Sequence, residues 1–79
     1  MKYYYILFEN HIDGMELEKV LKNRNIDFII SPTPRELSSS CGISIRIDLE
    51  LKNKVKEVIK EENLNFKSIE KLEVKSYFI

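Results

Sequence analysis

The alternation of apolar and polar residues in Ile43-Ser44-Ile45-Arg46-Ile47 constrains the fold of this chain more than any other feature. Successive side chains of a strand point to opposite faces of a sheet, so the pattern predicts a strand with three isoleucines on one face. Ser44 and Arg46 are expected on the other face. The segment therefore predicts a sheet that is packed on one side and open on the other.

Three other segments have the composition of strands. Residues 3–8 form an unbroken aromatic and β-branched run, and residues 27–31 are built on phenylalanine and isoleucine. Residues 66–74 are predicted to form the last strand, although Ile69 breaks the alternation of its other apolar residues. Together with the first segment, these predict a sheet of four strands.

Two stretches between these strands have helical spacing. Asp13 is expected to cap the first helix after a turn-like linker at residues 9–12, with Glu16 completing a capping box. Its apolar positions are Gly14, Leu17, Val20 and Leu21. Residues 23–25 are predicted to end it, because asparagine tolerates the left-handed conformation found there. Asp48 is expected to cap the second helix, which has apolar positions at Leu51, Val55, Val58 and Ile59.

The predicted order is strand, helix, strand, strand, helix, strand. Two right-handed crossovers then place both helices on one face of an antiparallel sheet, which is the α+β, ferredoxin-like βαββαβ sandwich. The other face is expected to be open, with Ser44 and Arg46 pointing outward, and available for pairing with a partner. Edge strands in this fold often pair between chains, so the oligomeric state stays open.

Length and charge restrict the class of protein. The chain has 79 residues and is expected to form one domain, with residues 75–79 possible as a tail outside the core. Its 13 basic and 13 acidic residues give no net charge, which argues against binding to nucleic acid or to an anionic membrane. A single cysteine cannot form an internal disulfide, so a cytoplasmic location is expected.

The segment between the second and third strands, residues 31–42, is far longer than a hairpin needs. Hairpin loops are usually about 2–5 residues long, and longer ordered loops are commonly functional. Pro32 and Pro34 restrict the backbone and favour order. The segment also holds Cys41, the only cysteine of the chain.

The residues around Cys41 can stabilise a thiolate. Consecutive backbone N–H groups, a positive φ at Gly42 and the charge of Arg35 would each favour the anion, as would the hydroxyl-bearing neighbours Ser38, Ser39 and Ser40. The same surroundings suit a persulfide or selenide. A free cysteine is, however, usually buried as a small hydrophobic residue. On the residues alone both interpretations stay open.

The stretch PRELSSSCGISIRI resembles the signature of a family of small domains described as putative Se/S carrier protein-like. The resemblance extends over nearly the whole chain, apart from residues 75–79. It implies that Cys41 transiently holds sulfane sulfur or selenium, with no other cofactor, and that Arg35, Ser38, Ser39, Ser40 and Gly42 shape its site. Glu36 matches without an assigned role. It also implies protein partners: a donor such as a cysteine desulfurase and a sulfur-relay acceptor.

The main alternative is a non-catalytic interaction module or small-anion sensor in which Cys41 is merely packed. His11 is the one possible general base, but it is expected in a solvated turn at the opposite end of the sheet from the cysteine loop. No pair of ligands has the spacing of a metal site. Residues 52–62 are interpreted as a solvated helix face with i,i+4 ion pairs. A chain this small is expected to lack a deep pocket, which favours a carrier over a turnover enzyme.

Overall fold

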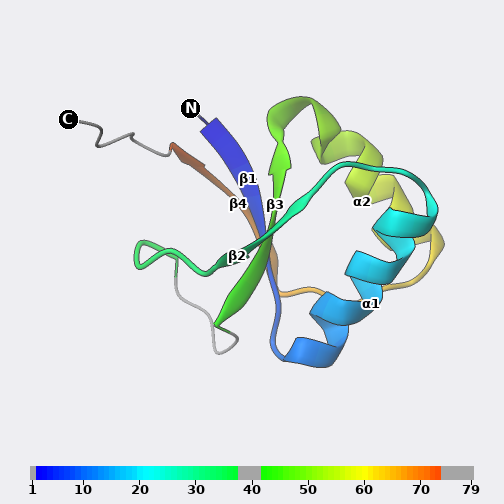
Figure 1. Ribbon diagram of the computed structural model, residues 1–79, viewed down its shortest axis with the longest axis horizontal. Helices are drawn as coiled ribbons and strands as arrows, with labels where there is room; N and C mark the ends of the chain where they lie inside the picture. Colours follow the sequence, from blue (N-terminus) through cyan, green and yellow to red (C-terminus); the bar gives the residue numbers. More distant parts are fainter. Residues whose placement is uncertain (1, 38–41, 74–79) are drawn as a thin grey trace.

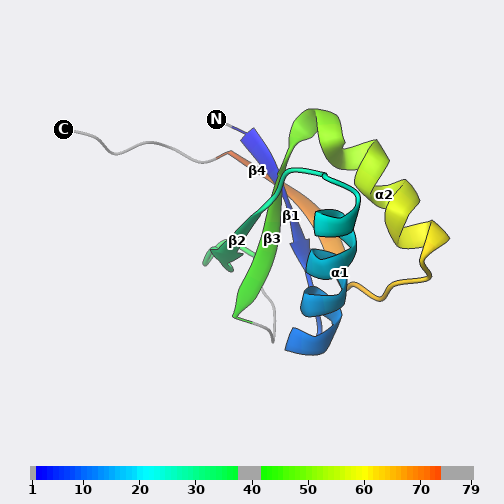
Figure 2. The ribbon, with the colours of Figure 1, turned by 45° about the vertical axis from the view of Figure 1, so that its right-hand side comes forward.

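In the computed structural model, which describes residues 2–37 and 42–73, four strands and two helices follow one another along the chain (Figure 1). They are β1 (Lys2–Leu7), α1 (His11–Asn23), β2 (Ile29–Pro32), β3 (Ile43–Asp48), α2 (Lys52–Glu61) and β4 (Ser68–Glu73), with a 3₁₀ turn η1 (Leu49–Leu51) before α2. The sheet has the order β2-β3-β1-β4, with antiparallel neighbours throughout. Both helices cover the same face (Figures 1 and 2). The predicted ferredoxin-like arrangement is confirmed.

The core lies between the helices and the two central strands. Register pairs Ile6 of β1 with Ile45 of β3, so both side chains point toward the helices. The buried cluster consists of Ile6, Phe8, Leu17, Leu21, Ile26, Ile45, Ile47, Val55, Val58 and Ile59. Burying each of these side chains contributes about 1.5–3 kcal/mol, which is why the apolar spacing in the sequence predicts these elements well.

Helix α1 begins earlier than the sequence predicts. Asn10, in an extended conformation, is the N-cap, and its Oδ1 accepts a hydrogen bond of 3.0 Å from the backbone N–H of Asp13. His11 and Ile12 are therefore helical, and the prediction that Asp13 caps the helix is wrong, because asparagine caps as well as aspartate. The other end is as expected: Asn25 has φ 57°, and the Ile26 N–H bonds to the Leu21 carbonyl at 3.0 Å.

Three of the remaining boundaries differ from the predictions. Asp48 precedes η1 and makes no side-chain capping bond, so it does not cap α2. Strand β2 is shifted toward the C-terminus and includes Pro32, which an edge strand tolerates because its missing N–H faces away from the ladder. Strand β4 begins at Ser68, with Ile69 on the helix side and Leu72 on the other face, so Ile69 sets the alternation.

The sheet face opposite the helices is not open at its centre. Tyr5, Leu7 and Ser44 are 3%, 2% and 0% exposed, although the register places them on the face away from α1 and α2. The Ser44 hydroxyl donates a hydrogen bond of 3.3 Å to the Ser31 carbonyl. Residues 33–37, after β2, run on this side of the sheet (Figure 1). Ser44 therefore lies on the predicted face, away from the helices, but it is buried there and not exposed to solvent as expected.

Candidate functional site

The loop between β2 and β3 has a closed neck. Strand pairing ends with Pro32 opposite Ile43, and one further hydrogen bond of 3.0 Å runs from the Thr33 N–H to the Gly42 carbonyl. The ladder thus continues by one step beyond the strands. The loop proper is residues 34–41, shorter than the predicted 31–42, and it contains the only cysteine of the chain.

Arg35 and Glu36 occupy the centre of a turn within this loop. The Leu37 N–H bonds to the Pro34 carbonyl at 3.0 Å, the i to i+3 hydrogen bond of a β-turn, with proline at the end that starts the turn. Both central side chains are exposed. The turn therefore holds the charge of Arg35 on the solvent side of the loop, within the same loop as the cysteine.

Gly42 does not have the conformation expected from the sequence. Its φ is not positive, since no glycine in the chain that the structure describes has a left-handed backbone. A Cβ built on Gly42 meets no atom within 4 Å, and the residue is exposed. The prediction of a positive φ is therefore wrong. The Gly42 carbonyl accepts the hydrogen bond from the Thr33 N–H that extends the β2–β3 pairing. Cys41, Ser38, Ser39 and Ser40 lie outside the described residues, and their roles stay predictions.

His11 lies at the same end of the sheet as the neck of the loop. Strands β1 and β3 are antiparallel, so the end of β1 is beside the beginning of β3. His11, at the start of α1, and Ile43, at the start of β3, line one cavity of about 220 Å³. The expectation that His11 lies at the opposite end from the cysteine loop is wrong. His11 is exposed there, in the first turn of a helix rather than in a turn-like linker.

An apolar surface surrounds this cavity. We call it the loop-side patch; it consists of Met15, Ile30 and Ile43, which line the cavity and are 65%, 43% and 39% exposed, and of Ile12, which is 67% exposed and three residues before Met15 on α1. The cavity is lined by Phe8, His11, Gly14, Met15, Glu18, Ile30, Ile43 and Ile45. One residue of the patch, Ile43, directly follows Gly42 at the neck of the loop. The sequence contains a signal for this patch, because Ile12 and Met15 are three residues apart and lie outside the apolar face that contains Leu17 and Leu21.

The three tyrosines of β1 have different surroundings, so their rings do not form one surface on which nucleic-acid bases could stack. The Arg46 guanidinium lies 4.3 Å from the ring centroid of Tyr3, on the sheet face away from the helices. Tyr4 packs on the core side, where Lys52 Nζ lies 4.7 Å from its ring centroid. Tyr5 is buried. Packing within the domain accounts for all three rings.

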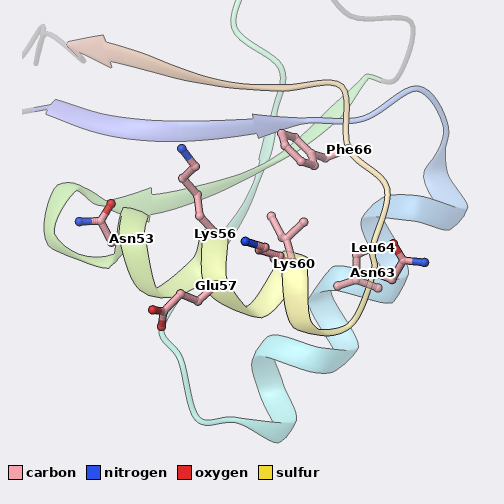
Figure 3. Close-up of a pocket in the computed structure, with 8 residues that line it drawn as sticks. Asn53, Lys56, Glu57, Lys60, Asn63, Leu64 and Phe66 are labelled. Atoms are coloured by element: carbon pink, nitrogen blue, oxygen red, sulfur yellow. The ribbon is translucent and has the colours of Figure 1, made fainter.

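A second cavity, of about 740 Å³, lies beside α2 (Figure 3). It is an open groove rather than a deep pocket, so it does not contradict the expectation that a chain of this size lacks a deep pocket. Among the described residues, no three His, Cys, Asp or Glu side chains are placed to hold a metal ion. None of the helices within residues 2–37 and 42–73 is both long and apolar enough to cross a membrane.

Comparison with protein families gives one match. The family described as "Putative Se/S carrier protein-like" matches residues 3–71 of the chain, which includes both helices, nearly all of the sheet and the whole β2–β3 loop. No curated protein matches, and no solved structure matches.

Proposed function

Because this chain belongs to the Se/S carrier protein-like family, we propose that it carries sulfur or selenium on Cys41 and passes it to a partner protein. One observation supports this most: the loop that contains the only cysteine rises from a closed neck directly beside an exposed apolar patch. A carrier needs an attachment atom next to a surface on which donor and acceptor proteins can dock. The neck of the cysteine loop and the exposed apolar patch lie together at the β2 side of the sheet.

The proposed chemistry is thiol exchange. The Cys41 thiolate attacks the outer sulfur of a persulfide on the donor; a new S–S bond forms at Cys41 and the donor's cysteine leaves as a thiolate. The acceptor's thiolate then attacks the outer sulfur on Cys41, which leaves as a thiolate in turn. No net oxidant or reductant is required. With selenium as cargo, a selenium atom takes the place of the outer sulfur.

Arg35 has a role in this proposal as a nearby cation. A positive charge favours the thiolate over the thiol and equally favours the bound persulfide anion, and so lowers the thiol pKa. The Pro34–Leu37 turn keeps the Arg35 side chain exposed within the cysteine loop. Arg35→Ala is expected to raise the pKa of Cys41; an unchanged pKa removes Arg35 from the site.

The loop-side patch is the proposed docking surface. Met15, Ile30 and Ile43 line a mostly apolar cavity of about 220 Å³, large enough for one or two apolar side chains of a partner. Anchors of this kind provide most of the binding energy of protein interfaces. The centre of the opposite sheet face, by contrast, is already buried. Docking at the patch brings the partner's cysteine to the mouth of the loop.

Intact mass measurement tests the proposal. The purified protein is incubated with a cysteine desulfurase and cysteine, separated from both, and weighed. A carrier gains one sulfur, loses it with dithiothreitol, and gains none as Cys41→Ser. A protein that gains no sulfur from an active desulfurase, with a thiol pKa near the ordinary ~8.5, is instead the interaction or anion-sensing module with a packed cysteine.

A further inference from the structure

A groove lies along one side of α2, at the β4 side of the sheet and away from the cysteine loop, since β2 and β4 are the two outer strands. We call it the α2 groove. Its volume is about 740 Å³, and it is lined by Asn53, Lys56, Glu57, Ile59, Lys60, Asn63, Leu64 and Phe66. Small-molecule sites typically measure about 300–1,000 Å³ and combine an apolar surface with a few polar groups. The α2 groove has this size and this composition.

The apolar side of the groove is held by the backbone. Asn63 has φ 54°, and the Leu64 N–H bonds to the Ile59 carbonyl at 3.0 Å, which turns the chain back at the end of α2. A hydrogen bond of 2.7 Å from the Lys67 N–H to the Leu7 carbonyl then fixes the returning segment to β1. Phe66, between these two anchors, is still 40% exposed. An aromatic face is therefore presented in the groove without being needed for the core.

The charged side of the groove holds two lysines and one glutamate, Glu57, so its net charge is positive. Lys56 and Lys60 are one helical turn apart on α2 and both line the groove. Lys56 extends toward the strands, whereas Glu57 points away from them (Figure 3). Two ammonium groups at i and i+4 repel each other, which costs about 0.2–0.5 kcal/mol. An anion bound between them removes this repulsion.

Two acidic residues at the end of α2 are engaged elsewhere, whereas Glu57 lines the groove together with the lysines. Arg24, after α1, donates hydrogen bonds of 3.1 Å to Glu61 and 2.8 Å to Glu62. The bond to Glu62 is the main reason why the pKa of Arg24 is raised above its ordinary value. The i,i+4 pairing predicted for this helix face is therefore not what the structure shows. Glu61 and Glu62, at the end of this face, bind Arg24 after α1, whereas Lys56 and Lys60 line the groove.

We propose that the α2 groove binds a small organic anion, in which a phosphate, sulfonate or carboxylate is attached to an apolar body of aromatic size. Lys56 and Lys60 contact the anionic group, and Phe66 with Ile59 and Leu64 contacts the apolar body. The amides of Asn53 and Asn63 lie at the two ends of the groove and add hydrogen-bonding groups. The proposed contacts come from α2 and the segment after it, and the proposal does not depend on the carrier function.

Two dyes that differ in one charged group test the proposal. Anilinonaphthalene sulfonate carries the anion, and phenylnaphthylamine is the neutral counterpart without the sulfonate. Each is titrated by fluorescence, and backbone amide shifts of the ¹⁵N-labelled protein locate the bound sulfonate. Saturable binding of the sulfonate is expected, with the largest shifts at the residues that line the groove. Lys56→Gln combined with Lys60→Gln should weaken the sulfonate by about tenfold or more and leave the neutral dye unchanged.

The matched control is Lys19→Gln combined with Lys22→Gln, which removes the same charge from exposed positions on α1, outside the groove lining. It should leave sulfonate binding within about twofold of the unmodified protein, since exposed charges at a distance are screened by salt. Equal weakening by the two pairs of substitutions overturns the proposal. So do shifts confined to the loop-side patch, or equal affinity for both dyes. If only an acidic peptide produces shifts in the groove, the occupant is a protein segment and the small-anion proposal is wrong.

Discussion

At the β2 edge of the sheet, a loop with the only cysteine stands beside four exposed apolar side chains; at the β4 side, two lysines and a phenylalanine line a larger groove. The β2 edge has no comparable cluster of cations among its cavity-lining residues, and its cavity is the smaller of the two. An exposed apolar surface suits a protein partner. A basic groove with an aromatic wall suits a small anion. A domain of 79 residues thus has two surfaces of different chemistry on the two sides of one sheet, and the two proposals assign a different kind of ligand to each.

Cys41→Ser gives the largest expected difference between the two edges. Sulfur loading by a desulfurase should be lost completely, because a hydroxyl cannot accept a persulfide sulfur. Binding of anilinonaphthalene sulfonate should be unchanged, since the described residues that line the α2 groove all belong to α2 and the segment after it. Intact mass and dye titration on one preparation measure both. Loss of dye binding in this variant would mean that the two edges are coupled.

Met15→Asp tests the loop-side patch. Met15 is 65% exposed, so the substitution should change the free energy of unfolding by less than about 0.5 kcal/mol. A charge at the cavity rim should nevertheless slow sulfur loading by the donor by about tenfold, as expected for an interface anchor. Asn65→Asp adds the same charge at an exposed position away from the patch and should load at the normal rate. Equal rates for the two variants would place donor docking elsewhere.

Phe66→Ala sharpens the account of the α2 groove. Removal of the ring takes away apolar contact but no charge, so both the sulfonate and the neutral dye should bind about threefold more weakly. The lysine substitutions, by contrast, should affect the sulfonate alone. Dye titrations of the two sets of variants separate the apolar contribution from the electrostatic one. An unchanged affinity for both dyes in Phe66→Ala would exclude the ring from the site.

Gly42→Ala has the smallest expected effect. Because Gly42 has no left-handed φ and an added Cβ meets no atom, alanine should raise the free energy of unfolding by about 0.4–1 kcal/mol through the unfolded state. Urea denaturation measures the change. The rate of sulfur loading should stay the same. A loss of stability above about 1 kcal/mol would show that the neck of the loop requires glycine.

The fold follows from local patterns in the sequence. The alternation at residues 43–47 and the helical spacing of Leu17, Leu21, Val55 and Ile59 reflect burial against a neighbouring layer, and this requirement is visible in one segment at a time. The features that were predicted wrongly depend on distant contacts. Ser44 is buried although its segment alternates correctly, because its burial depends on residues distant in the sequence, such as Ser31, whose carbonyl accepts its hydroxyl.

The same limit applies to the two candidate sites. Nothing near Glu61 and Glu62 in the sequence indicates that both are paired with Arg24, a residue 37 and 38 positions away. The lysines of α2 therefore looked neutralised. The position of His11 follows from antiparallel pairing of β1 with β3 rather than from its neighbours. The cysteine loop could be predicted because its length and its serine-rich composition are properties of the segment itself.

The carrier claim is tested most directly by cyanolysis of the loaded protein. The chain is charged with a desulfurase and cysteine, freed of small molecules, and treated with cyanide, which removes an outer persulfide sulfur as thiocyanate. The account predicts one thiocyanate per loaded chain and none from Cys41→Ser under the same conditions. Absence of thiocyanate from the unmodified protein, while the desulfurase turns over cysteine in the same tube, would contradict it.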